Sequence, residues 1–115
     1  MNNSQKIKLF WKITRHINKK FCKNRLQIND IILFKEGNLH KSFPKNRGWY
    51  LLDEKHILIG KNLDFIIQLV ILAHELSHAY QHQILGYKDR IRHDKKGGKM
   101  YQKFLKETNK ILFKK

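Results

Sequence analysis

An apolar stretch in the second half of the chain constrains its fold most. Residues 65–73 are apolar except for Gln68, and they lead directly into the sequence HELSH at residues 74–78. Because the apolar residues cover nearly every side of a helix, we expect a helix over residues 64–85 whose first half is buried at the centre of the molecule. Gly86 suits the left-handed position that follows such a helix.

The rest of the chain predicts two more helices and a small sheet. Apolar residues recur at helical spacing from Ile7 to Phe21, which predicts an amphipathic helix over residues 4–21. The last helix should begin at Gly97 or Gly98 and bury its apolar side. We expect three strands, over residues 26–34, 48–52 and 56–59, with loops at residues 35–47 and 87–96. The plan is an α+β fold in which helices cover a small sheet.

Length and composition limit the kind of protein. The chain has 115 residues, which predicts one domain over residues 1–115. Its longest apolar run is shorter than the ~20 residues needed to span a membrane, and its N-terminus lacks an apolar signal block. The single cysteine, Cys22, excludes an internal disulfide and a four-cysteine zinc ribbon. We therefore expect a cytoplasmic monomer, in the host cytoplasm if the chain is viral.

The chain is strongly basic, with 25 Lys and Arg against 9 Asp and Glu and a net charge of +16. Such a charge favours a polyanionic partner, with DNA or RNA first. Arginine, which makes bidentate contacts to phosphates and bases, is scarce, and lysine, isoleucine and asparagine all have AT-rich codons. We therefore expect nonspecific binding through lysine and little reading of base sequence.

The chemical signal is the HExxH motif of His74, Glu75 and His78. Residues four apart on a helix differ by about 40° in direction and ~6 Å in height, so both imidazoles can bind one metal ion. Glu75 lies about 100° from His74 and can reach a water molecule at the metal. Zn²⁺ lowers the pKa of such a water, and the carboxylate can transfer its proton to a leaving amine. The motif therefore predicts metal-assisted peptide hydrolysis.

A catalytic zinc needs a third protein ligand and one open position. His82 lies about 12 Å along the helix from His74, too far to share a tetrahedral ion. His93 is the preferred candidate because it follows a loop and precedes two glycines, where the chain can fold back over the motif. Glu107 is the next choice. The other candidates are Asp89 and Asp94.

The run from His74 to Gln81, HELSHAYQ, resembles the active-site helix of SprT-like zinc metallopeptidases, which include the Spartan proteases. In that family a third histidine begins a glycine-containing segment after a loop, and His93, Gly97, Gly98 and Phe104 occupy this region here. The resemblance implies a zincin-like protease core with Zn²⁺ held by His74, His78 and His93. It also implies Glu75 as general base and then acid, with protein substrates that include DNA-associated proteins.

Two alternatives remain beside the SprT-like resemblance. In this chain three residues separate His93 from the first glycine, so the family's His-Gly pair is broken. ImmA/IrrE-like peptidases have a similar order of hairpin and HExxH helix but use a downstream acidic ligand, a role that Glu107 would fill. The chain could instead be a basic nucleic-acid-binding module with a structural metal site. In a peptidase, Tyr87 or Tyr101 could stabilise the oxyanion of the tetrahedral intermediate.

Overall fold

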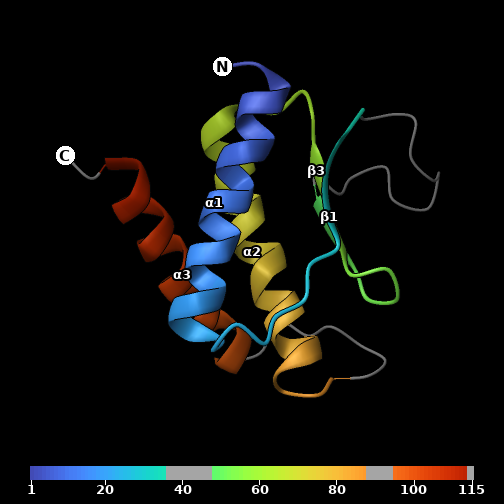
Figure 1. Ribbon diagram of the computed structural model, residues 1–115, viewed down its shortest axis with the longest axis vertical. Coiled ribbons are helices and arrows are strands. Elements are labelled where there is room, and N and C mark those ends of the chain that lie inside the picture. Colours follow the sequence, from blue (N-terminus) through green and yellow to red (C-terminus); the bar gives the residue numbers. More distant parts are fainter. Residues whose placement is uncertain (36–47, 88–94, 114–115) are drawn as a thin grey trace.

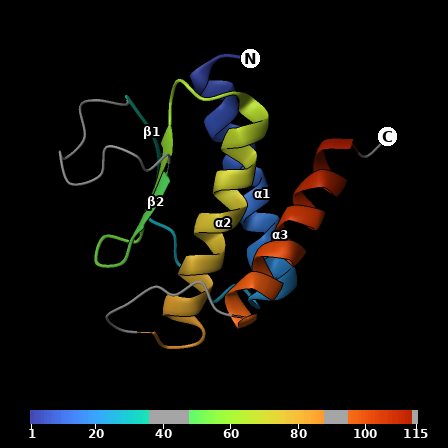
Figure 2. The same ribbon diagram turned by 180° about the vertical axis from the view of Figure 1, so that it is seen from behind.

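Three helices and three strands make up the described part of the fold (Figures 1 and 2). The computed structural model describes residues 1–35, 48–87 and 95–113. The helices pack side by side, and the sheet lies along one side of them. The predicted α+β class is confirmed. The elements, in chain order, are α1 (Asn3–Phe21), β1 (Asp30–Phe34), β2 (Gly48–Leu51), β3 (His56–Gly60), α2 (Phe65–Gln83) and α3 (Lys95–Phe113).

The sheet is mixed, with strand order β1-β3-β2. Strand β2 pairs antiparallel with β3, so that Tyr50 lies opposite Ile57, while β1 pairs with β3 in parallel, Ile31 opposite Ile57. The predicted hairpin over residues 48–59 is confirmed, and its turn ends at Lys55, whose φ of 55° is left-handed. Among the described strands, β2 is therefore an edge strand with one side unpaired.

Strand β1 is shorter than the predicted strand over residues 26–34. Asn18 of α1 binds Leu26 twice: its side-chain amide donates to the Leu26 carbonyl (2.8 Å) and its side-chain oxygen accepts from the Leu26 N–H (2.9 Å). Leu26 itself is buried in the core. The first residues of this apolar segment are thus tied to the end of α1, and sheet pairing starts only at Asp30.

Helix α2 is the central element, as its apolar sequence predicts. It contacts α1, α3, β2 and β3, and Leu72, Ala73, Leu76 and Ala79 are fully buried. The chain leaves it through Gly86, whose φ of +81° confirms the expected left-handed position. The core is completed by buried residues from the other elements, chiefly Phe10, Ile13, Ile17, Ile31, Ile57, Ile59 and Phe104.

Helix α3 begins at Lys95, two residues before the predicted start at Gly97. Gly97 is buried within the first turn, so the glycines belong to the helix rather than to the loop before it. The predicted apolar side is confirmed by Phe104, which packs on Phe21 of α1 with ring centroids 5.7 Å apart. Within the described residues, no helix combines the length and apolar character needed to cross a bilayer.

Candidate metal centre on helix α2

The HExxH residues lie in the second half of α2, on the part of the helix that faces β2 and the start of α3. The rings of His74 and His78 lie side by side, with centroids 4.5 Å apart and planes inclined by 57°. His78 is buried, while 38% of the His74 side chain is exposed. The pair thus forms a site with one buried and one accessible imidazole, the ligand type that suits Zn²⁺.

Gln81 fixes the orientation of His78. Its side-chain oxygen lies 2.9 Å from His78 Nδ1, and Gln81 is itself fully buried. Because an amide oxygen only accepts, the hydrogen-bonded Nδ1 carries the proton, and in the neutral ring Nε2 is left with its lone pair for a metal. A buried hydrogen-bond acceptor on the second ring nitrogen is typical of metal-binding histidines. The donor set of this chain therefore fits a zinc ion.

Gln81 was not predicted as a site residue. Its signal in the sequence is a polar residue three positions after His78 on the same helix, a spacing that puts both on one side.

Glu75 is buried beside the histidines, with 6% of its surface exposed. Burial raises the pKa of its carboxyl group from 4.5 to about 8, and a hydrogen bond from the Tyr50 backbone N–H lowers it in part. One carboxylate oxygen, Oε2, lies 3.6 Å from His74 Nδ1. A carboxyl group that titrates near neutral pH can both accept and return a proton, which suits the general base and acid predicted for Glu75.

Strand β2 approaches α2 closely because residue 48 is glycine. A Cβ atom at Gly48 would collide with the Ile71 side chain, and it would lie 3.1 Å from the Leu58 carbonyl oxygen and 3.6 Å from Glu75 Oε2. Any side chain here would push β2 away from α2. Gly48 thus lets the strand reach Glu75, a role that the sequence analysis did not predict.

His82 joins α2 to β2. Its Nδ1 lies 2.7 Å from the Tyr50 hydroxyl, which also accepts a hydrogen bond from Gln83 Nε2 at 2.9 Å. The side chain of Tyr50 therefore holds the end of α2, while its backbone N–H holds Glu75. The contact holds the His82 ring against β2.

Tyr101 is the tyrosine that the described structure places at the site. Its ring meets the edge of His74, with centroids 5.6 Å apart and planes inclined by 71°. Tyr101 lies in the second turn of α3, so this helix contacts the histidine pair through His74. Tyr87, the other predicted candidate, contacts α2 through its backbone N–H, which donates to the Gln81 carbonyl.

Glu107 faces α1 rather than the histidines. Its carboxylate lies 2.8 Å from His16 Nε2 and 3.0 Å from Lys20 Nζ. The bond to His16 lowers the pKa of Glu107, and the bond and charge of Lys20 lower it further, while burial opposes them. On a helix, Glu107 points about 120° away from Tyr101 and lies ~9 Å further along the axis. This alternative third ligand is thus occupied in an ion pair between helices.

The other predicted ligands, His93, Asp89 and Asp94, lie outside the described residues. Within the described ranges, no group of three His, Cys, Asp or Glu side chains is arranged to hold a metal ion. Cys22 is buried, and burial raises the pKa of its thiol to about 11. The described part of the centre is therefore the pair His74 and His78 with Glu75 and Gln81.

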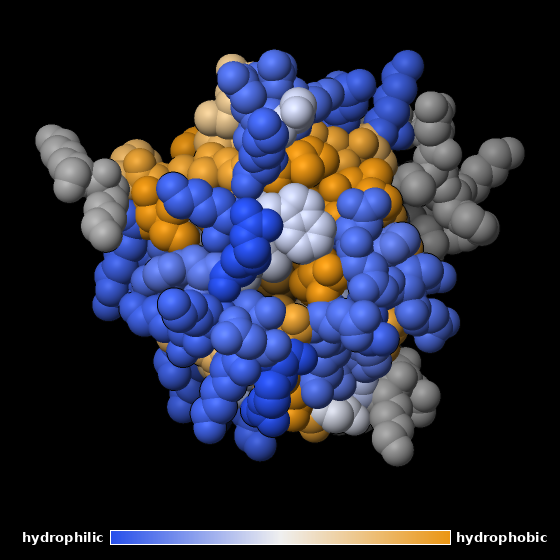
Figure 3. All heavy atoms as spheres, in the orientation of Figure 1, coloured by the Kyte–Doolittle hydropathy of each residue, from blue (hydrophilic) through white to orange (hydrophobic). Residues whose placement is uncertain are grey.

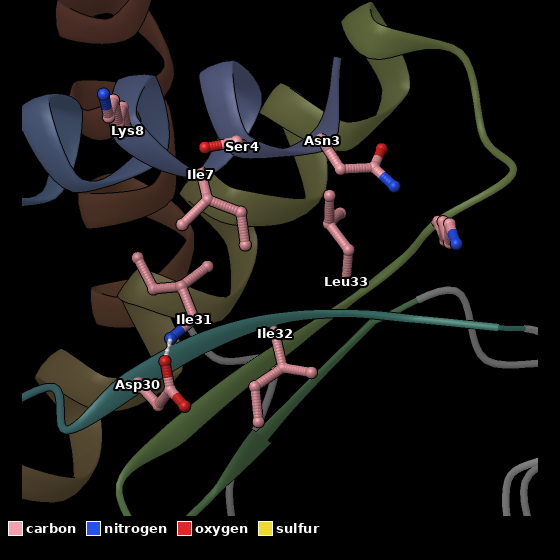
Figure 4. Close-up of a pocket in the computed structure, with 9 residues that line it drawn as sticks. Asn3, Ser4, Ile7, Lys8, Asp30, Ile31, Ile32 and Leu33 are labelled. Atoms are coloured by element: carbon pink, nitrogen blue, oxygen red, sulfur yellow. Dashed lines mark hydrogen bonds between the residues drawn. The ribbon is translucent and has the colours of Figure 1, made fainter.

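A cavity of about 500 Å³ lies elsewhere, between the start of α1 and strand β1 (Figure 4). Its walls combine apolar side chains such as Ile7 and Ile32 with Lys8, Lys61 and Asp30. None of its lining residues belongs to α2, so the cavity is separate from the metal centre.

The exposed side of α1 is basic. Lys8, Lys12, Arg15 and Lys19 are exposed and lie within about 60° of one another around the helix. Hydrophilic side chains cover much of the molecular face on which α1 lies (Figure 3). These four residues, called the α1 basic face below, are a candidate surface for contacts to phosphate.

Comparison of the chain with protein-family models, curated proteins and solved structures found no match.

Proposed function

We propose that the chain is a zinc-dependent metallopeptidase of the SprT-like kind, which hydrolyses peptide bonds in protein substrates. The observation that carries the proposal is the histidine pair beside the buried carboxyl group of Glu75, with Gln81 fixing the second imidazole. A solvated or capping HExxH motif would need neither a buried glutamate nor a buried acceptor on His78, since both are costly to desolvate.

His74 and His78 would hold the zinc ion, with His93 proposed as the third ligand. When bound, zinc supplies a Lewis acid that polarises the peptide carbonyl and lowers the pKa of water. Glu75 accepts the proton of the attacking water and returns it to the leaving amine. The Tyr50 N–H holds Glu75 in place, and the Tyr101 ring supports His74.

The contact of Glu107 with α1 favours His93 over Glu107 as the third ligand, and so favours the SprT-like over the ImmA/IrrE-like proposal. A Glu107 that bound zinc would have to leave His16 and Lys20. That change would break a charged interaction between α1 and α3, which is costly when one partner is buried.

The test combines elemental analysis with a proteolysis assay on the purified protein. We expect one zinc ion per chain, hydrolysis of an unfolded protein substrate, and loss of both in His74→Ala. Glu75→Gln should keep the zinc and lose the activity, because Glu75 handles protons and does not bind the metal. Loss of zinc in Glu75→Gln, or full activity in this variant, would contradict the assigned role.

A second candidate is a basic nucleic-acid-binding module, and the observation that favours it is the α1 basic face. Each neutralised phosphate releases counterions, so binding to DNA should weaken steeply as salt rises. Replacing Lys12 and Arg15 with glutamine should reduce this salt dependence, and Lys110→Gln on α3 is the control. Metal-dependent proteolysis by the wild type but not by Glu75→Gln would exclude a purely structural metal.

A further inference from the structure

An exposed apolar stripe on α2 leads to the candidate metal centre. Ile66 and Val70 are 61% and 36% exposed. Val70 follows Ile66 by four residues, and His74 follows Val70 by four, so the three residues form one line along the helix. Residues four apart lie on one face of a helix. The half-buried Ile67 and Ile71 flank this line. We call these four isoleucine and valine residues the α2 stripe.

The α2 stripe is unusual in this chain because it carries no positive charge. Lys and Arg make up 25 of the 115 residues, yet none occurs among the 19 residues of α2. The exposed sides of α1 and α3 are rich in lysine. Exposed positions of a helix are normally polar, so two exposed apolar side chains on a line that ends at His74 mark a candidate binding surface.

Strand β2 sets the direction in which a peptide would cross the α2 stripe. Gly48 lies against Ile71, and Tyr50, two residues later, binds His82, so β2 and α2 run in the same direction. Antiparallel pairing is commoner than parallel pairing, and β2 is an edge strand of the described sheet. A peptide paired antiparallel with β2 runs opposite to α2.

This direction places the two ends of the peptide. With the cleaved bond at His74 and Glu75, the residues that follow the bond lie toward Val70 and then Ile66. Four residues of helix span ~6 Å, close to the ~6.6 Å of two strand residues, so each step along the stripe matches two residues of an extended peptide. Alternate side chains of the peptide would therefore meet Val70 and Ile66.

We propose that the α2 stripe binds apolar side chains on the C-terminal side of the cleaved bond. The substrate class is then an extended polypeptide with Leu, Ile, Val or Phe within about four residues after the bond, a spacing set by the strand rise. This inference rests on the proposed peptidase function. Val70 and Ile66 are specificity-determining residues in it, and they take no part in the chemistry.

The activity test uses two peptides that differ only in the second residue after the cleaved bond, leucine in one and aspartate in the other. The wild type should prefer the leucine peptide, and Val70→Lys should lower the ratio of the two kcat/KM values by about tenfold or more, the range for one apolar contact. Asn109→Lys adds the same charge at an exposed position of α3 and should leave the ratio unchanged. An unchanged ratio in Val70→Lys overturns the inference.

A binding test separates this inference from the proposed function. Fluorescence anisotropy of the labelled leucine peptide is measured with Glu75→Gln, which is expected to be inactive, and with the same protein carrying Val70→Lys. Weaker binding by about tenfold in the double variant supports the stripe even if the wild type hydrolyses nothing. Hydrolysis by the wild type with equal binding by both variants would overturn the stripe and leave the peptidase proposal standing.

Discussion

Glu75 should destabilise the metal-free protein at neutral pH, and Glu75→Gln should remove this effect. The folded protein raises the pKa of the carboxyl group from 4.5 to about 8, mainly by burial. An acid with a raised pKa stabilises the fold fully below its unfolded pKa and loses that contribution as pH rises through the folded pKa. The metal-free wild type should therefore lose stability between about pH 4.5 and pH 8.

The size of the effect follows from the two pKa values. At about 1.4 kcal/mol per pKa unit, Glu75 destabilises the fold by about 1 kcal/mol at pH 5 and about 3 kcal/mol at pH 7, because the folded protein keeps the carboxyl group protonated while the unfolded chain ionises it. The gap in unfolding free energy between Glu75→Gln and wild type should thus widen by about 2 kcal/mol over this range. For a chain of this length, that is roughly an 8 °C change in the Tm difference.

The assay is urea unfolding of zinc-free protein at pH 5, 6 and 7, followed by circular dichroism. The control is Glu54→Gln, an exposed glutamate in the β2–β3 turn, whose gap to the wild type should not follow this trend. Because His74 Nδ1 lies 3.6 Å from Glu75, repeating the series in His74→Ala removes the contribution of the imidazole. A gap that stays constant with pH would refute the reasoning.

Three further predictions concern the metal ligands and the α1–α3 ion pair. His93→Ala should lower zinc affinity by about tenfold or more, while Glu107→Ala should leave it nearly unchanged. A zinc titration that gives the reverse would favour the ImmA/IrrE-like proposal. Gln81→Leu should lower zinc affinity by about 10- to 100-fold, because His78 loses the hydrogen-bond acceptor on Nδ1. Gln81→Glu keeps an acceptor and should retain most of the wild-type affinity. Equal zinc affinity in the wild type and both variants would show that Gln81 has no such role. Glu107→Gln should cost about 1–3 kcal/mol of stability above pH 5, and the loss should disappear in acid. The reason is that a carboxyl group with a lowered pKa stabilises the fold above its unfolded pKa and loses that contribution as pH falls. The measurement is urea unfolding against pH, and a pH-independent loss would contradict the prediction.

The sequence predicted the elements well where the apolar pattern was local. The central helix, the hairpin and Gly86 follow from residues close together in the chain. The shortened β1 could not be predicted, because the Asn18 side chain that captures Leu26 lies eight residues earlier and acts through tertiary contact. The early start of α3 has the same kind of cause, since buried Gly97 is helical through packing despite its poor helix propensity.

The same distinction between local patterns and tertiary contacts applies to the candidate site. HExxH spacing is a local signal and predicted His74, Glu75 and His78 as neighbours. The contacts of Tyr50 with Glu75 and His82 depend on how closely β2 approaches α2, which Gly48 permits and the sequence pattern does not reveal. The same limit applies to Glu107, whose partners His16 and Lys20 are about ninety residues away in the chain.

The order of the strands has a consequence for folding. The hairpin of β2 and β3 is followed directly by α2, so one continuous segment from Gly48 to Gln83 holds the histidine pair, Glu75 and Gln81. Of the described strands, only β1 lies outside this segment. It pairs in parallel register with β3, and such non-local pairing is slow because loop closure comes first. The candidate metal centre should therefore assemble early from local contacts, with β1 and the flanking helices docking on it afterwards.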